Sequence, residues 1–128
     1  MKIRLSSLMV DDQDKALSFY TDILGFVKKT DIPMGSARWL TVASPDEQEK
    51  MELVLEPTAF PPARRYQKEL FDAGIPATAF ASDDLQAEYD RMRGLGVVFR
   101  SAPEKAGSVT VAVFEDTCGN LIQIYEVK

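Results

Sequence analysis

The sequence contains no histidine, and this absence excludes more chemistry than any other feature of its composition. Without imidazole there is no Ser–His or Cys–His nucleophile pair, no histidine acid–base catalysis and no histidine ligand for zinc or iron. The single cysteine, Cys118, excludes an internal disulfide and any cysteine-based zinc cluster, and it is typical of a reducing compartment. Any chemistry therefore falls to carboxylates, amides, hydroxyls, Lys, Arg, Tyr or Cys118.

Basic charge and long apolar runs are also scarce. The chain has 15 Lys and Arg residues against 20 Asp and Glu residues, a formal net charge of −5, and no basic run. Nucleic acid is therefore not an expected partner, because nothing in the chain would neutralise a phosphate backbone. The apolar stretches are strand-sized, far below the roughly 20 residues that span a bilayer, so no membrane partner is expected either. Met1 leads directly into a strand-like segment instead of a signal peptide, which predicts a cytoplasmic protein.

What the sequence does contain is an internal repeat. Its 128 residues, 45% hydrophobic and 27% charged, have the composition of one globular domain. Within it, the segment from Asp11 to Phe26 is echoed by the segment from Asp83 to Val97. We therefore predict one domain, residues 1–128, built from module 1 (1–56), a linker helix within 57–74 and module 2 (75–128).

Each module is predicted to have the order βαβββ. An Asp-Asp pair ends the first strand of each module and is suited to cap a helix, so these aspartates are interpreted as structural. In module 1, apolar residues from Ala16 to Leu24 follow helical spacing, and Gly25 supplies the stop. A thinner apolar stripe from Leu85 to Leu95 predicts the second helix. The predicted strands are Ile3–Val10, Val27–Thr30, Ala37–Ala43, Met51–Glu56, Ile75–Ala81, Val97–Ser101, Val109–Phe114 and Leu121–Val127.

Two motifs resemble the vicinal oxygen chelate superfamily, which is the glyoxalase, bleomycin resistance protein and dioxygenase family. They are the segment Val10-Asp11-Asp12 through Ala16, Phe19-Tyr20 and Leu24-Gly25-Phe26, and the turn Asp116-Thr117-Cys118-Gly119-Asn120-Leu121. The resemblance implies an α+β, glyoxalase-like fold in which two βαβββ modules form a cupped, incomplete eight-stranded barrel. The concave face of this barrel holds the ligand in the family, often with a divalent metal. Members often dimerise, so a homodimer is expected.

The resemblance also implies where a metal would bind. In the metal enzymes of the family, the first and last strands of each module each supply one ligand. Here the first-strand positions are Leu5 and Ala77, which cannot bind a metal, and the last-strand positions are Glu52 and Gln123. We therefore expect no cofactor. The alternative is a weakly held divalent ion such as Mg²⁺ or Mn²⁺ on Glu52 and Gln123, because oxygen donors suit hard cations.

Strand alternation predicts which side chains line the concave face. Glu52 lies between Met51 and Leu53, where a carboxylate must find a partner or a water-filled cavity. The same alternation assigns Leu40, Val42, Val111 and Val113 to the core and leaves Thr110, Ala112 and Phe114 for the cup. The predicted ligand-binding residues are Ser7, Trp39, Thr41, Glu52, Phe114, Gln123 and Tyr125. Aromatic walls beside a carboxylate favour an aromatic or cationic ligand.

Two functions remain open at this point, with a ligand-free assembly module as a third. The first is a small-molecule-binding protein of the glyoxalase and bleomycin-resistance type, without the usual metal site. The second is a lyase or isomerase of the same superfamily, metal-assisted or metal-free, in which Glu52 is the catalytic base. Trp39 has an alternative role as an ordinary packed aromatic residue, and Glu56 as a surface charge. Cys118 lies in a turn that could expose its thiol, but no histidine is available to activate it.

Overall fold

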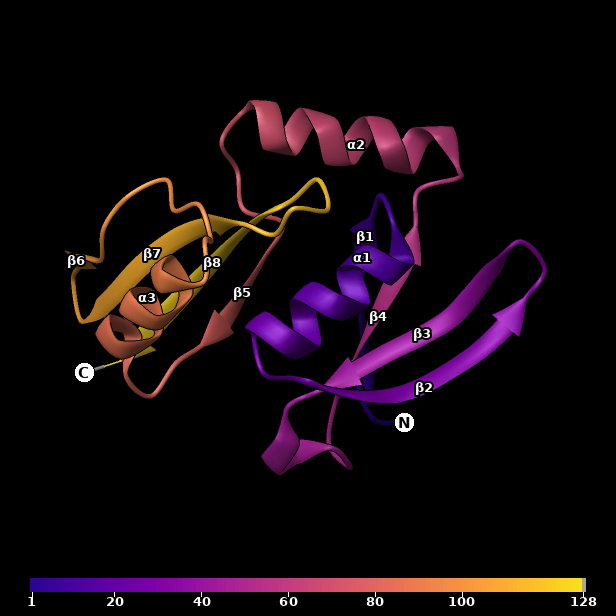
Figure 1. Cartoon of the computed structure of the whole chain (residues 1–128), viewed down its shortest axis with the longest axis horizontal. Coiled ribbons are helices and arrows are strands. Elements are labelled where there is room, and N and C mark those ends of the chain that lie inside the picture. Colours follow the sequence, from indigo (N-terminus) through magenta and orange to yellow (C-terminus); the bar gives the residue numbers. More distant parts are fainter. Residues whose placement is uncertain (128) are drawn as a thin grey trace. The chain divides into compact units, whose positions relative to one another are not determined.

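The chain forms two compact units, Met1–Tyr66 and Gln67–Lys128, and the computed structural model describes residues 1–127 of it. The first unit contains β1 (Leu5–Val10), α1 (Gln13–Ser18), a π-helical turn η1 (Phe19–Ile23), β2 (Val27–Met34), β3 (Ala37–Ala43), a 3₁₀ turn η2 (Pro45–Glu47) and β4 (Glu52–Pro57). Its sheet has the strand order β1-β4-β3-β2 (Figure 1). Strand β1 runs parallel to β4, and the other neighbours are antiparallel.

The second unit repeats this plan. It contains β5 (Thr78–Ala81), α3 (Leu85–Gly94), β6 (Glu104–Ala106), β7 (Val109–Glu115) and β8 (Leu121–Val127). The strand order β5-β8-β7-β6, with β5 parallel to β8, matches that of the first unit. Helix α2 (Pro61–Asp72) contains the boundary between the two units. The predicted α+β fold of two βαβββ modules is therefore confirmed.

Aspartate caps begin both module helices, as predicted. The Asp12 carboxylate accepts a hydrogen bond from the Lys15 amide at 3.0 Å, and the Asp84 carboxylate accepts one from the Ala87 amide at 3.1 Å. Each cap supplies a partner for a backbone donor that the first turn leaves unpaired. Helix α1 continues into the π-helical turn η1, and Gly25 follows with a positive φ of 85°, which glycine adopts without steric cost.

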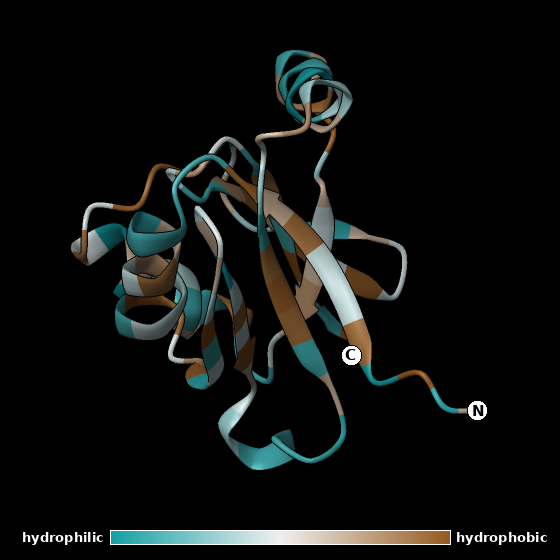
Figure 2. Ribbon diagram, turned by 90° about the vertical axis from the view of Figure 1, so that its right-hand side faces the viewer, coloured by the Kyte–Doolittle hydropathy of each residue, from teal (hydrophilic) through white to brown (hydrophobic). Residues whose placement is uncertain are grey.

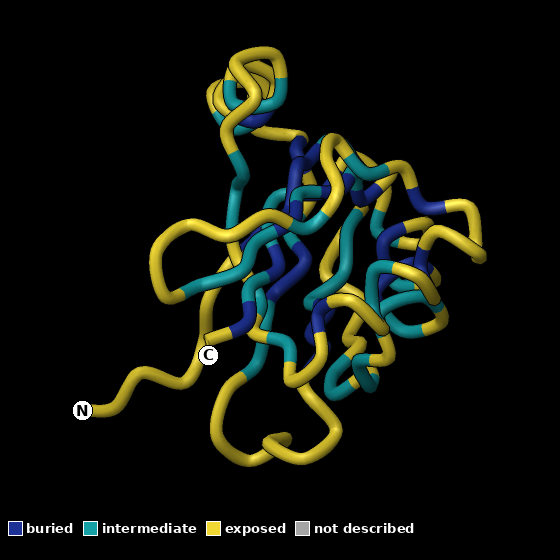
Figure 3. The backbone as a smooth tube through the Cα atoms, turned by 90° about the vertical axis from the view of Figure 1, so that its left-hand side faces the viewer, coloured by how far each residue is buried: buried dark blue, intermediate teal, exposed yellow. Residues whose placement is uncertain are grey.

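The core of each unit lies between its sheet and its module helix. Figure 3 shows the buried stretches in the strands and exposed residues at the N-terminus and in the loop after β3. In Figure 2 the strands carry much of the hydrophobic colour, whereas α2 is largely hydrophilic. None of the helices within residues 1–127 is long and apolar enough to cross a membrane. The largest side chains that are almost fully buried are Tyr20, Leu40, Leu55, Leu85, Met92, Phe114, Leu121 and Ile122, and all of these except Leu121 lie on the helix side of their unit.

The prediction of a strand at Val97–Ser101 is wrong. Only Phe99 forms an isolated bridge there, to Phe114, and the regular edge strand β6 begins at Glu104. Pro103 lies between the two and has no amide hydrogen to donate to a neighbouring strand. The edge of the second sheet is therefore interrupted before β6.

Candidate functional site

The first sheet has two distinct faces. Its helix side carries the buried residues Leu8, Val10, Leu40, Val42 and Leu55. We call the opposite side the open face, because most of its residues are half-buried or exposed, although Thr41 and Val54 are buried on it. The structure places on it Ser7 and Met9 of β1, Trp39 and Thr41 of β3, and Glu52, Val54 and Glu56 of β4. Four of the predicted site residues, Ser7, Trp39, Thr41 and Glu52, therefore share one face.

Glu52, the first residue of β4, is one of two carboxylates on this face, with Glu56, and a neighbouring strand holds it. The Thr41 hydroxyl donates a hydrogen bond to Glu52 Oε1 at 2.7 Å. Thr41 is fully buried and Glu52 is half-buried, so this bond fixes the carboxylate on the face of the sheet. Glu52 Oε2 accepts no hydrogen bond from residues 1–127 and can accept one from a ligand.

Trp39 supplies the apolar part of the open face. It is half-buried and lies opposite Ile32 of the edge strand β2, and Ile32 is 53% exposed. Trp39 is also the only tryptophan in the chain. Trp39 and Ile32 therefore form an apolar pair, exposed at Ile32, on the same face as the Glu52 carboxylate. Aromatic and apolar walls with a few fixed polar groups are the usual composition of a small-molecule site.

The second sheet places Gln123 and Tyr125 on its own open face. On the neighbouring strand β7, Val113 lies opposite Gln123 and Val111 lies opposite Tyr125. On the other neighbour, β5, Ala79 lies opposite Gln123. The Gln123 side chain is half-buried and forms no hydrogen bond with the residues that the structure describes. The valines of β7 therefore line this face, although alternation had assigned them to the core.

Phe114, together with Thr110 and Ala112, lies on the other side of the second sheet, so its predicted position in the cup is wrong. Its fully buried ring packs against Phe99 at 5.5 Å between centroids, and Phe99 packs against Tyr89 of α3 at 4.7 Å. The large phenyl ring fills the space under α3 that smaller valines would leave open. The signal was available in the turn Asp116–Asn120, because a hairpin closed there places Phe114 opposite Ile122, a predicted core residue.

The donors present do not fit the divalent metal site of the family. On β1, Leu5 lies opposite Glu52, and on β5, Ala79 lies opposite Gln123. Ala77 precedes β5 and donates its amide hydrogen to the Leu121 carbonyl at 2.8 Å. At the ligand positions of the family, each unit thus offers one oxygen-bearing side chain, Glu52 or Gln123, and an apolar residue on its first strand. Zinc and iron sites need nitrogen, sulfur or several carboxylate ligands, and magnesium or calcium sites need more oxygens than this. We therefore derive no chemical step through a metal.

Cys118 is buried, which corrects the expectation that the turn could expose it. The Asp116 carboxylate accepts hydrogen bonds from the Cys118 amide at 2.8 Å and from the Asn120 amide at 3.0 Å. Gln67 of α2 covers the turn, and its Nε2 donates to the Cys118 carbonyl at 3.1 Å. The turn is a packed structural element, and its sulfur is shielded from substrates.

A separate surface hollow of about 400 Å³ lies at the N-terminus of α3 and contains none of the predicted site residues. Three of its four charged groups already have structural roles, Asp83 being the fourth. Asp84 caps the helix, and Glu88 forms an ion pair with Arg91 at 2.6 Å. We therefore assign it no function.

Two βαβββ units, each with a four-stranded sheet whose first and last strands are parallel neighbours, define a glyoxalase-like fold. The chain belongs to the Glyoxalase/Bleomycin resistance protein/Dioxygenase superfamily, whose family model matches residues 3–124.

Its relatives cover nearly the whole chain. The uncharacterized protein YurT of Bacillus subtilis (strain 168) is 56% identical over 126 residues, which are 98% of this chain and 99% of YurT. The crystal structure of UcmS2 has a TM-score of 0.84 and 32% identity, covering 98% of this chain and 97% of that one. The crystal structure of TnmS3, an antibiotic binding protein from Streptomyces sp. CB03234, has a TM-score of 0.79 and 28% identity, covering 100% and 97%.

Proposed function

We propose that the protein binds a small organic ligand on the open face of its first unit, without a divalent metal. The observation that carries this proposal is the Glu52 carboxylate, held through Oε1 by Thr41 on the same face as Trp39. Similarity to TnmS3, an antibiotic binding protein, supports the binding of a small molecule.

The charge of the site indicates the kind of ligand. Glu52 Oε2 is directed to no donor among residues 1–127, so a ligand ammonium or amidinium group can donate a charge-assisted hydrogen bond to it. The Trp39 ring offers a surface for an aromatic group or a cation. By the β3–β4 register the position opposite Glu52 is Ala43, four residues along β3 from Trp39, a separation of about 13 Å at roughly 3.3 Å per residue. A ligand whose cationic and aromatic groups are about that far apart satisfies both groups at once. The formal net charge of −5 also attracts a positively charged ligand.

A homodimer in the cytoplasm is part of this proposal. Ile32 and Met34, near the end of β2, are 53% and 60% exposed, and this apolar pair is where we propose that the second copy packs. A second copy of the chain is the partner that family membership favours. Native mass spectrometry tests this, because a solution mass of one chain contradicts the dimer.

The ligand proposal is tested on gently purified protein by native mass spectrometry and metal analysis of the same sample. A Trp39 fluorescence titration with metal-free bleomycin, used as a cationic aromatic probe, follows. We expect no stoichiometric metal and a saturable quench that Glu52→Gln weakens by roughly tenfold, the loss of one charge-assisted hydrogen bond. The matched control Glu47→Gln, in the exposed turn η2, should bind as the wild type does. One equivalent of divalent ion per chain, lost in Glu52→Gln, would contradict the proposal.

The alternative function is a lyase or isomerase with Glu52 as general base, and the open Oε2 atom favours it. The oxygen of a base must come within about 2.6–3.2 Å of the atom whose proton it removes, and the Glu52 Oε2 atom is available for such a contact. Turnover of the hemithioacetal of methylglyoxal and glutathione by the wild type, abolished in Glu52→Gln, would establish this alternative. Turnover that survives Glu52→Gln would remove Glu52 as the base.

A further inference from the structure

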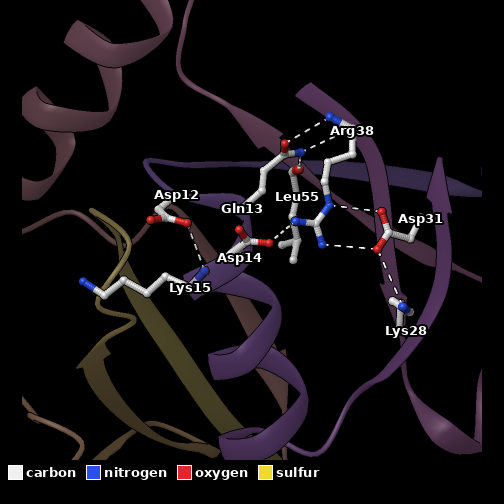
Figure 4. Close-up of polar contacts among 8 residues, drawn as sticks. All are labelled: Asp12, Gln13, Asp14, Lys15, Lys28, Asp31, Arg38 and Leu55. Atoms are coloured by element: carbon white, nitrogen blue, oxygen red, sulfur yellow. Dashed lines mark hydrogen bonds and ion pairs between the residues drawn. The ribbon is translucent and has the colours of Figure 1, made fainter. Parts of the chain in front are cut away.

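Gln13, the first residue of α1, inserts its side chain between strands β3 and β4 (Figure 4). Its Nε2 donates hydrogen bonds to the Arg38 carbonyl at 2.8 Å and to the Leu55 carbonyl at 2.9 Å. The Arg38 amide donates in return to Gln13 Oε1 at 3.2 Å. A carboxamide has the donors and acceptor of a peptide group, so Gln13 takes the place of a strand partner.

The sequence of β4 explains why a substitute is needed. Strands β3 and β4 pair only at Thr41 with Val54 and at Val42 with Leu53. If this antiparallel register continued, Arg38 would lie opposite Pro57, which has no amide hydrogen. The Arg38 carbonyl would then have no donor from β4. A part-buried carbonyl without a donor is costly, and Gln13 supplies that donor.

The Arg38 side chain is fixed by the same end of α1. Its guanidinium pairs with Asp14, next to Gln13, and with Asp31 of β2 at 3.0 Å (Figure 4). The hydrogen bond from Arg38 holds the pKa of the Asp31 carboxyl below its usual value, and the hydrogen bond to Asp14 is the main cause that raises the pKa of Arg38. Both the main chain and the side chain of Arg38 are therefore tied to α1.

Trp39 follows Arg38 and points to the opposite face, because successive side chains of a strand alternate. Glu56 follows Leu55 in the same way. The groups that Gln13 binds are thus the immediate backbone neighbours of two open-face residues. We propose that Gln13 is a positioning residue: from the helix side of the sheet it sets the place of Trp39 on the open face, and through Trp39 it sets ligand affinity. The effect on ligand affinity rests on the proposed function. The effect of Gln13 on the position of Trp39 does not, and it can be tested without a ligand.

The test compares Gln13→Ala and Gln13→Glu with the wild type. Alanine removes all three hydrogen bonds, whereas a glutamate carboxylate can accept from the Arg38 amide but cannot donate to the two carbonyls. We expect Trp39 emission to move to longer wavelength and its quenching by acrylamide to rise in both variants. The affinity for metal-free bleomycin should fall roughly tenfold. The matched control is Gln48→Ala, whose side chain donates only to the Pro45 carbonyl in the exposed loop, and it should change neither readout.

The outcomes separate this inference from the proposed function. Unchanged Trp39 emission and quenching in a Gln13→Ala protein with native circular dichroism would overturn the inference, whether or not the probe binds. A changed Trp39 signal with unchanged affinity would overturn the link to binding. If the wild type does not bind the probe, the proposed function fails while the emission shift still tests Gln13. If Gln13→Ala does not fold, Gln13→Asn replaces it, because its shorter side chain cannot reach both carbonyls.

Discussion

The two units share one plan but close their central hairpins differently. Strands β7 and β8 pair without interruption from Val109 with Val127 to Glu115 with Leu121, whereas β3 and β4 pair only at Thr41 with Val54 and Val42 with Leu53. At the first position of the module helix the first unit has Gln13 and the second has Leu85, which is almost fully buried. The complete β7–β8 pairing leaves no backbone group that needs a hydrogen bond from a side chain, so the first position of α3 can be the apolar residue Leu85. The unit whose ladder ends early is also the one whose open face combines Trp39 with a carboxylate.

The loops that join these strands also differ: the loop of the second unit is buried and hydrogen-bonded, and that of the first is exposed. The β7–β8 turn is buried, and Asp116 accepts hydrogen bonds from two backbone amides and from Asn120 Nδ2 at 2.8 Å. The segment between β3 and β4 is exposed and includes η2, whose Asp46 and Glu47 lie in solvent. The second unit therefore has a rigid hairpin, while the first can change its loop at little cost.

The largest expected effect comes from the buried turn. Asp116→Ala leaves two amides and the Asn120 side chain without their acceptor, and each buried donor without a partner costs roughly 1–3 kcal/mol, so the free energy of unfolding should fall by about 3 kcal/mol or more. Asp46→Ala, in the corresponding exposed loop, should change it by less than about 0.5 kcal/mol. Urea denaturation measures both values. Equal losses in the two variants would show that the loops do not differ in the way described.

A reciprocal exchange tests the difference between the helix N-termini. Gln13→Leu removes the donor for the Arg38 and Leu55 carbonyls, and Leu85→Gln buries a carboxamide beside a complete ladder. Each substitution should lower the free energy of unfolding by about 1–3 kcal/mol, because each leaves a buried polar group without a hydrogen-bond partner. Urea denaturation again gives the values. An unchanged free energy of unfolding in Leu85→Gln would mean that the second unit also accepts a glutamine side chain between its strands. The proposed difference between the two helix N-termini would then be wrong.

The smallest expected effect is on the pH dependence of stability, through the ion pair between Asp31 and Arg38. Because Arg38 holds the pKa of Asp31 below its usual value, the ionised Asp31 stabilises the fold at neutral pH. That contribution is lost as the pH falls through the usual carboxyl range and then through the lowered pKa. In Asp31→Asn it is absent throughout, so the melting temperature of the variant should approach that of the wild type as the pH falls below about 4. Thermal melts from pH 7 to pH 2 measure this, and curves that stay parallel would contradict it.

Much of the fold could be predicted because its signals are local. The aspartate caps, the apolar stripe from Ala16 to Leu24 and the strand alternation of β3 and β4 each depend on neighbours in sequence, and the structure confirms their secondary-structure assignments. The face of β7 was missed because β-branched valines are typical core residues, and only the register with β8 shows that Phe114 fills the space under α3.

The roles of Gln13 and Cys118 could not be predicted for a different reason. Gln13 follows a capping aspartate, where a polar residue is typically exposed, and its partners Arg38 and Leu55 come from two strands distant in sequence. The burial of the Cys118 turn likewise depends on Gln67, which is 51 residues away. Long-range side-chain contacts of this kind leave no periodic pattern.

The most direct test of the account is an amide and indole NMR titration of the whole protein with metal-free bleomycin. The account predicts that the largest shifts fall on the open face of the first unit, at the Trp39 indole and at the amides of Thr41 and Val54, with Glu88 and Arg91 of α3 unchanged. Shifts concentrated around the α3 hollow, with Trp39 unmoved, would contradict a ligand site on this face.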